Sequence, residues 1–513
     1  MEPIERIRIV GAGAMGRGIA QVAATAGYRV EITDTNGDAV RAALEFVAAM
    51  IQRSVDKGKR DADEAATILA RLTAGTAPTA PSPDIDLVIE AVVEKLPVKR
   101  AIFAELETAT PNAVLASNTS SLSITAIAAA LHDPSRLIGL HFFNPVPLMS
   151  LVEIVPGLRT APELVDTATA FVDRIGHTPI LARDTPGFLV NHIGRALPSE
   201  ALAILSEQVA APADIDRIVR DTIGLRMGPF ELMDLTGLDV SHPVMETVSA
   251  GFYGDPRLRP SPIAAARVAA GLLGRKTGEG FYRYQDGAPL LPAEPDIAPD
   301  AEATAVHVHD HPDFAAALRR AGATVLESPD AEAVSLVLPI GEPTYRLAAR
   351  YGLDPARTLG IDPLGLGRGR LTVVVPAAAD PLATAPALRV LAAAGYTPTP
   401  TADGTAPVAQ RILGAIVNLS CALAEHGIGT PEDIDRGARL GLGYPLGPLE
   451  LGESVGTERV TAILDGLYAY TRDPRYRVSS WLRTRAEQRI SLHTTGTRPE
   501  DLLTNRGTDV RSL

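Results

Sequence analysis

The first part of the chain alternates short apolar runs with stretches of helical periodicity. It opens with an apolar run, a glycine-rich turn, a small-residue helix and a second apolar run, at Ile7 to Val10, Gly11 to Gly16, Gly18 to Ala26 and Tyr28 to Thr33. Short apolar runs bounded by turn residues are typical of buried strands. This order predicts a βαβ unit.

Further apolar runs continue the pattern at Leu87 to Ala91, Val114 to Ser117 and Leu137 to Phe143, with helical stretches such as Lys99 to Thr108 between them. Strands that alternate with helices predict a parallel sheet covered by helices. We therefore expect an α/β domain over residues 1–184.

After Pro186 the pattern changes. Gly187 to Ser206 and Ala213 to Thr222 have helical periodicity with few strand signals, and the region closes at Gly280 to Tyr282. This predicts an all-α domain over residues 185–284. Residues 285–304 are rich in Pro, Asp and Ala, which is typical of an interdomain linker.

The sequence then repeats itself with a shift of 219 positions. The shift places Pro212 to Arg217 on Pro431 to Arg436, and Gly228 to Leu232 on Gly447 to Leu451. An ungapped match of about 60 residues favours duplication over chance. We expect a degenerate Rossmann-like repeat at 305–402, a second helical domain at 403–492 and a tail at 493–513.

The repeat is incomplete. The turn after its first strand is Asp310-His311-Pro312, without a glycine that would let a pyrophosphate approach a helix N-terminus. We therefore expect no second dinucleotide site.

Composition narrows the possible partners. The net charge of −13 opposes binding to nucleic acid, which depends on many Lys and Arg side chains. Cys421 is the single cysteine, and Met1 to Val10 resembles a first strand more than a signal peptide, so we expect a cytoplasmic protein. Apolar stretches are soon interrupted by polar residues or Pro, so no membrane span is expected.

The segment Gly11-Ala12-Gly13-Ala14-Met15-Gly16 fits the G-x-G-x-x-G fingerprint directly after a strand and at the start of a helix. Gly11 permits the tight turn, Gly13 the approach of a pyrophosphate and Gly16 close helix packing. Asp34 ends the next strand, where a carboxylate binds ribose hydroxyls and repels a 2′-phosphate. The pattern predicts a Rossmann dinucleotide-binding domain that prefers NAD to NADP; the alternative is a glycine-rich turn that binds another nucleotide or none.

His141 and Glu153 lie at the ends of two successive apolar segments, joined by a loop that contains Pro. An imidazole, whose unperturbed pKa is about 6.5, can accept the proton of an alcohol while a hydride leaves. A carboxylate on its other nitrogen fixes the tautomer and stabilises the imidazolium. The alternative is a histidine satisfied within the core.

Four segments resemble the signatures of L-3-hydroxyacyl-CoA dehydrogenases. They are Ser117 to Leu122, His141 to Pro145, Asp184 to Asn191 and Gly228 to Glu231, and the resemblance covers about residues 4 to 284. It implies NAD-dependent oxidation of (S)-3-hydroxyacyl-CoA to 3-ketoacyl-CoA, with an acyl-CoA as the partner and no metal. The duplicated length is most similar to bacterial members that act on 3-hydroxyadipyl-CoA in phenylacetate catabolism, or on 3-hydroxybutyryl-CoA.

The resemblance also implies roles for individual residues. His141 would be the general base paired with Glu153, Asn144 would help to position His141, and Ser120 and Asn191 would contact the substrate. The residues that match cofactor contacts of the family are Glu94, Lys99 and Asn118. Two alternatives stay open: Glu94 and Lys99 as an exposed pair at a helix start, and Asn118 and Ser120 as caps of the following helix.

Coenzyme A carries phosphates, so a basic surface beside the cleft is expected. The family's CoA-contacting Ser and Lys match the region of Ser54, Lys57 and Lys59, next to Arg53 and Arg60. A solvated helix face is the alternative. An ω-carboxylate on the substrate would need a cation, for which Arg195 and Arg226 are candidates.

The second copy lacks the base, because the shift puts Gly360 at the place of His141 and Gln410 at that of Asn191. We expect it to be structural and to take the place of a partner subunit, which leaves either a monomer with an internal pseudo-dimer or a homodimer. The alternatives are a dehydrogenase of a free hydroxy acid and a non-catalytic nucleotide-binding protein.

Overall fold

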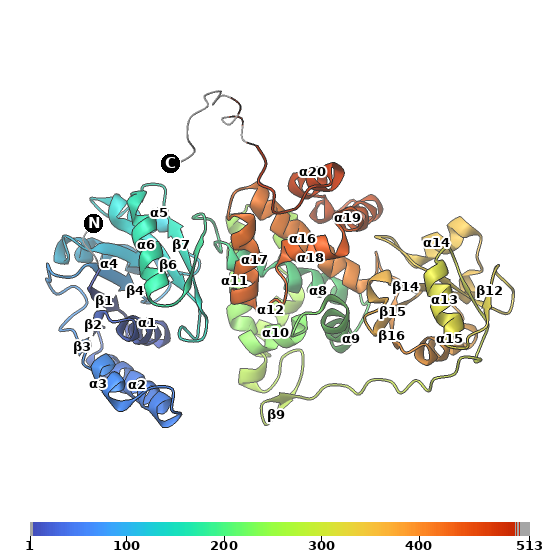
Figure 1. The fold of residues 1–513 in the computed structure, drawn as a ribbon, viewed down its shortest axis with the longest axis horizontal. Coiled ribbons are helices and arrows are strands. Elements are labelled where there is room, and N and C mark those ends of the chain that lie inside the picture. The colour runs from blue at the N-terminus through green and yellow to red at the C-terminus, as the bar shows by residue number, and fades with distance from the viewer. Residues whose placement is uncertain (1–3, 498, 500–501, 503–513) are drawn as a thin grey trace.

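The computed structural model describes residues 4–497, 499 and 502. An α/β unit lies at each end of the long axis, and the helices of both copies lie together between them (Figure 1). The first unit has an eight-stranded sheet of order β3-β2-β1-β4-β5-β6-β7-β8. Its strands are β1 Arg6–Val10, β2 Arg29–Thr33, β3 Leu72–Ala74, β4 Leu87–Glu90, β5 Val114–Ser117, β6 Leu137–Phe142, β7 Leu151–Pro156 and β8 Thr178–Leu181.

The central strands are buried on both faces because helices cover the sheet, which explains their continuous apolar runs. The helices of this unit are α1 Ala14–Thr25, α2 Gly37–Asp56, α3 Ala62–Leu69, α4 Leu96–Ala109, α5 Ile124–Ala128 and α6 Glu163–Arg174. Helices α2 and α3 form a hairpin that projects away from the sheet (Figure 1).

One strand pair differs from the expected parallel sheet. Strands β6 and β7 are antiparallel, whereas the other neighbours in this sheet are parallel. A parallel return needs a crossover of about a dozen residues, and the loop from Phe143 to Ser150 is too short for one.

The first helical domain contains α7 Val190–Ile193, α8 Ala196–Ser206, α9 Pro212–Ile218, α10 Pro229–Thr236, α11 Leu238–Gly251 and α12 Pro262–Ala269. The repeated Asp of the sequence motif holds this domain together. Asp216 accepts hydrogen bonds from the N–H groups of Phe230 and Glu231 and from the hydroxyl of Tyr282. Burial raises the pKa of Asp216 to about 7.

The second copy repeats this architecture, as predicted from the shift. Its six-stranded sheet has the order β12-β11-β13-β14-β15-β16, and β14 and β15 are again antiparallel. The strands are β11 Val306–Val308, β12 Val325–Leu326, β13 Val334–Val337, β14 Thr358–Ile361, β15 Arg370–Val375 and β16 Thr397–Ala402, and the helices are α13 Pro312–Arg320, α14 Thr344–Tyr351, α15 Pro381–Ala393, α16 Val408–Glu425, α17 Pro431–Leu442, α18 Pro448–Val455, α19 Thr457–Thr471 and α20 Ser480–Gln488.

The predicted tail begins too early. His493 Nε2 lies 2.7 Å from Asp435 Oδ2, and the Arg485 guanidinium donates to the carbonyl of Thr494. Asp435 is the repeat of Asp216, so His493 takes the place that Tyr282 has in the first copy. The second helical domain therefore extends at least to Thr494.

The predicted linker is anchored to both copies. After the short hairpin of β9 Tyr284–Gln285 and β10 Ala288–Pro289, it runs along one side of the molecule to the second α/β unit (Figure 1). Glu294 lies 3.3 Å from Arg217 of the first helical domain and 2.8 Å from Arg370 of β15. The linker thus forms ion pairs with both copies.

The two helical domains share one hydrophobic core, as the pseudo-dimer hypothesis requires. The contacts are reciprocal: the N–H of Arg183 donates to the carbonyl of Ile428, and the N–H of Ala402, 219 positions later, donates to that of Val209. Such exchange is the mark of a two-fold related interface. Helix α16 is apolar and long enough to cross a membrane, contrary to the sequence expectation, but 89% of it is buried here, which is expected of a core helix.

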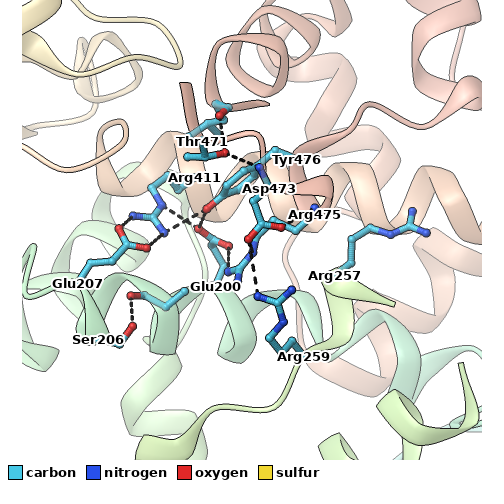
Figure 2. Close-up of polar contacts among 12 residues, drawn as sticks. Glu200, Ser206, Glu207, Arg257, Arg259, Arg411, Thr471, Asp473, Arg475 and Tyr476 are labelled. Atoms are coloured by element: carbon cyan, nitrogen blue, oxygen red, sulfur yellow. Dashed lines mark hydrogen bonds and ion pairs between the residues drawn. The ribbon is translucent and has the colours of Figure 1, made fainter. Parts of the chain in front are cut away.

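A buried ion cluster joins the two helical domains (Figure 2). The Arg411 side chain of α16 is fully buried and lies 2.8 Å from Glu200 Oε1 and 2.8 Å from Glu207 Oε1, both in or next to α8. The Tyr476 hydroxyl donates to the same Glu200 oxygen. Both carboxylates come from the first copy and the cation from the second.

Replacing Arg411 by Ala should destabilise the protein by about 3–5 kcal/mol, because the buried Glu200 would keep only the longer ion pair with Arg475, at 3.5 Å, and would lose its 2.8 Å partner. Chemical denaturation would measure the loss. The control is Arg259→Ala, since Arg259 is 58% exposed and lies 3.8 Å from Asp473, a geometry that contributes less than about 1 kcal/mol. Equal denaturation midpoints for the two variants would contradict the structural role of the cluster.

Candidate active site

The antiparallel register of β6 and β7 places His141 directly opposite Glu153. Their side chains meet at 2.6 Å between Nδ1 and Oε2, and the residues are 5% and 0% exposed. The rings of Phe143 and Phe188 lie 4.4 Å and 5.7 Å from the imidazole centroid. A carboxylate at Nδ1 selects the tautomer that keeps its proton there, which leaves Nε2 as the acceptor.

The other oxygen of Glu153 is held from the helical domain. Oε1 accepts hydrogen bonds from the N–H groups of Leu189 and Val190, at 2.9 Å and 2.8 Å, where α7 begins. These donors are free because the first N–H groups of a helix have no partner within it. Glu153 is therefore fixed between the histidine and the first turn of α7.

The glycine-rich turn has the shape that a dinucleotide needs. Gly11 has a φ of 110°, and a Cβ there would lie 2.5 Å from the Ala91 carbonyl oxygen, so only glycine fits. A Cβ at Gly16 would collide with the Gly11 carbonyl, whereas Gly13 has open space on that side. Gly13 provides no side-chain cap to α1, so the N–H groups that begin this helix, including those of Ala14 and Met15, are available to phosphate.

Asp34 stands at the end of β2 and supports the same turn. Its Oδ2 accepts the N–H of Ala12 at 2.9 Å, and its Oδ1 accepts that of Asn36 at 3.0 Å. Oδ1 also accepts the Thr35 hydroxyl, at 3.4 Å. A carboxylate has about four acceptor positions, so Oδ2 can still bind a ribose hydroxyl. The residues present therefore fit NAD.

Lys99 lies in a buried ionic cluster that includes a residue not singled out in the sequence. Its Nζ lies 2.5 Å from Glu90 Oε1 and 3.3 Å from Glu94 Oε2, and Lys99 is 1% exposed. Glu90, at the end of β4, also accepts the hydroxyl of Ser117. The alternative of an exposed helix-start pair is thus wrong for Lys99, whereas Glu94 is exposed.

Glu94 orders the loop after β5. Its Oε1 accepts the N–H groups of Ser120 and Ser121 at 2.9 Å and 3.0 Å and the hydroxyl of Thr119 at 2.6 Å. Burial raises the pKa of Glu94, but the bond from Thr119 and the charge of Lys99 outweigh it, so the pKa is lower than usual.

Asn118 and Ser120 do not cap the helix that follows, so that alternative is also wrong. Helix α5 is capped by Ser123, whose hydroxyl accepts the N–H of Ala126. Asn118 instead accepts the N–H of Phe142, next to His141, at 2.9 Å. Asp184 begins one of the four segments that resemble the family, and the sequence predicts no role for it. It accepts the N–H groups of Ile124 and Thr125 and so ties α5 to the segment that joins the two domains.

The other predicted site residues are placed as follows. Asn191 is half-buried in α7, directly after Val190, and Asn144 is exposed in the loop after β6. Within the described residues the Asn144 side chain makes no hydrogen bond. No hydrogen bond therefore supports its predicted role in positioning His141. Glu153, Phe143 and Phe188 hold the imidazole instead.

The residues predicted to contact coenzyme A lie where α2 ends. The Ser54 hydroxyl donates to the carbonyl of Ile51 at 2.6 Å, and Lys57 and Lys59 are exposed. Neither lysine pairs with a carboxylate within the described residues. Both ammonium groups are therefore available to a phosphate.

In the second copy, the protein's own side chains fill the corresponding position. Gln410 is fully buried, accepts the N–H of Gly341 and donates to the Pro339 carbonyl and to Asp362. The start of α13 is capped by His311, which accepts the N–H of Phe314. Gly360 has no side chain at the place of His141, and a Cβ there would collide with the Thr344 side chain.

Two family models match these regions. The model of the 3-hydroxyacyl-CoA dehydrogenase NAD-binding domain matches residues 6–185, and that of the C-terminal domain of the same dehydrogenases matches residues 187–284 and again 408–497. The chain belongs to the 3-hydroxyacyl-CoA dehydrogenase family.

This dehydrogenase has relatives along its whole length. It is 36% identical to a 3-hydroxyadipyl-CoA dehydrogenase of Escherichia coli over 94% of this chain and 98% of that protein. The crystal structure of a 3-hydroxybutyryl-CoA dehydrogenase from Escherichia coli K12 superposes with a TM-score of 0.84 at 35% identity, and covers 95% of this chain and 99% of that one. A probable 3-hydroxybutyryl-CoA dehydrogenase of Bacillus subtilis is 39% identical over 55% of this chain and 98% of its own length.

The family and the domain models confirm the predicted reaction class and cofactor. The chain is an NAD-dependent oxidoreductase of 3-hydroxyacyl-CoA thioesters, with an NAD-binding Rossmann domain, a helical domain and a second partial copy of both. The whole-length relatives also confirm the predicted subgroup of duplicated bacterial enzymes.

Replacing Asp34 by Ala should raise the KM for NADH about ten-fold or more, since a hydrogen bond to a charged group contributes about 1.5–3 kcal/mol. The KM for NADPH should fall or stay unchanged, because the carboxylate that repels a 2′-phosphate is gone. Steady-state kinetics with both cofactors would measure the ratio. An unchanged preference would show that another group selects the cofactor.

Proposed function

We propose that His141 is the general base of this dehydrogenase and that Glu153 orients it. The observation that carries the proposal is the 2.6 Å contact of Nδ1 with a buried carboxylate, which leaves Nε2 as the proton acceptor. A core histidine does not need a carboxylate that is itself held by two N–H donors. This arrangement is costly to bury and is characteristic of a functional site.

In this proposal the (S)-3-hydroxyacyl chain lies between the sheet and the first helical domain. Nε2 of His141 accepts the proton of the 3-hydroxyl, and Glu153 stabilises the imidazolium that forms. Ser120 and Asn191 hold the 3-oxygen or the thioester. NAD⁺ supplies the hydride acceptor. In the reverse direction the imidazolium returns the proton to a 3-ketoacyl-CoA.

Wild-type protein should oxidise NADH in the presence of acetoacetyl-CoA, and NADPH much more slowly. His141→Gln keeps a polar side chain of similar size, so NADH binding should stay near normal while turnover falls by the ~10²- to 10⁴-fold typical of general-base loss. Absorbance of reduced nicotinamide gives turnover, and fluorescence titration gives NADH affinity.

Each outcome distinguishes the alternatives. Wild-type turnover in His141→Gln would refute the base. Saturation by a free hydroxy acid with no gain from the CoA part would favour the free-acid enzyme. NADH binding without any turnover on either kind of substrate would favour a non-catalytic protein.

We further propose that the preferred substrate carries an ω-carboxylate, as 3-hydroxyadipyl-CoA does, and that Arg195 recognises it. This is the substrate in the name of the whole-length relative. Arg195 lies one turn beyond Asn191, donates to the carbonyls of Asn191 and Ser241, and has no carboxylate partner within the described residues. Burial lowers its pKa to about 10, so it stays charged at neutral pH. Arg226 is exposed.

Arg195→Met keeps an unbranched apolar stem and removes the charged guanidinium. It should lower kcat/KM for 3-ketoadipyl-CoA about ten-fold or more, the loss expected for one charged hydrogen bond, with little change for acetoacetyl-CoA. Parallel steady-state assays of the two substrates would show the split, with Arg226→Met as the comparison. Equal losses on both substrates would contradict this role.

A further inference from the structure

The two residues that hold Glu153 are covered by the second copy of the fold. Three glycines in or near α17 leave room for the side chains of Leu189 and Val190. A Cβ at Gly441 would lie 2.7 Å from Cγ1 of Val190, and one at Gly429 would lie 2.8 Å from Cδ2 of Leu189. At Gly437 the distance to Cγ2 of Val190 would be 3.2 Å. Real Cβ atoms hardly ever come closer than about 3 Å to a neighbour, so a side chain at Gly441 or Gly429 would displace its neighbour, and one at Gly437 would be tight.

Helix α17 also touches the strand that carries Glu153. A Cβ at Gly441 would lie 3.6 Å from Leu151 Cδ1, two residues before Glu153 on β7, and one at Gly437 would lie 3.6 Å from Ile180 of β8. The bond from Arg183 N–H to the Ile428 carbonyl fixes the chain just before α17 to the same domain. The second copy thus contacts both the strand and the helix between which the carboxylate lies.

The pseudo-symmetric contact on the other side of the molecule is built differently. There α9 and the turn after it pack against α16. On that side Ile218 and Thr222 take the places of Gly437 and Gly441, which lie 219 positions later. By the same shift, Val408 and Ala409 of the second copy take the places of Leu189 and Val190. The glycines therefore occur on the side of the His141 and Glu153 pair. The side chains that pack against them there, Leu189 and Val190, are larger than Val408 and Ala409 on the other side.

Helix α7 needs support of this kind. It spans only Val190–Ile193, and so short a helix is not stable by itself in water. The N–H groups of Leu189 and Val190 keep their direction only if packing holds these residues. A valine side chain has few rotamers, so a shift of Val190 moves its backbone as well.

We propose that α17 of the non-catalytic copy is a positioning element of the active site. Through Gly437 and Gly441 it holds Val190, the Val190 and Leu189 N–H groups hold Glu153, and Glu153 orients His141. The proposal rests on the proposed role of the His141 and Glu153 pair. It gives the second copy a measurable part in turnover, although it contributes no group that touches substrate or cofactor.

The decisive variant is Gly441→Ala in the full-length protein. The added methyl group displaces Val190, so kcat should fall roughly ten- to hundred-fold, the loss that a misplacement of about 1 Å causes, with the KM for NADH unchanged. The matched control is Gly452→Ala, where a Cβ would lie 2.8 Å from Val417 Cγ1 and 3.1 Å from Leu492 Cδ1, both within the second helical domain, and where no α7 atom is among the nearest neighbours. It should lose similar thermal stability and keep its turnover.

Val190→Ala in the Gly441→Ala background removes the displaced methyl groups but keeps the N–H that donates to Glu153. Turnover should recover in this double variant, and the milder Gly437→Ala should fall between wild type and Gly441→Ala. If Gly441→Ala misfolds, the Gly437→Ala result decides alone. Turnover of the Gly441 and Gly437 variants equal to that of Gly452→Ala, in a protein whose His141→Gln variant is inactive, would overturn the positioning role. An active His141→Gln would instead show that the proposed function itself is wrong.

Discussion

The carboxylate of Glu153 is the interaction on which the rest of the site depends. Glu153 belongs to the sheet of the first domain. One of its oxygens binds the imidazole of His141 on the same sheet, and the other accepts two N–H groups of the helical domain. A buried carboxylate is stable only when its lone pairs are used, so neither domain can move away without leaving a charge unpaired. The same group therefore contributes to the relative position of the two domains and to the orientation of the His141 imidazole.

Much of this could be predicted from the sequence, because the signals are local or periodic. The glycine fingerprint, Asp34 and the 219-residue repeat need no knowledge of distant contacts. His141 and Glu153 could be paired because they lie on consecutive strands of one hairpin. The structure differs from the predicted boundaries at the start of the tail, where His493 and Thr494 bond to the second helical domain.

What could not be predicted depends on residues far apart in the chain. Glu90 ends an apolar strand, and the sequence does not show that Lys99 and Ser117 contact its carboxylate. The role of Asp184 is seen only in the structure, where its carboxylate accepts N–H groups at the start of α5. The same holds for Gly441, whose small size has no meaning until Val190 lies against it. A Cβ that is absent leaves no pattern in a sequence.

The reciprocal bonds of Arg183 and Ala402 have a consequence for how the fold is maintained. Separate subunits would form such an interface only above a threshold of concentration, and dilution would dissolve it. Here a chain of about twenty residues joins the two halves, so their local concentration is set by its length and stays high however few molecules a cell contains. One paired His141 and Glu153 per two folds is the stoichiometry that follows, and the half with Gly360 at the place of His141 is free to diverge wherever it does not touch the other.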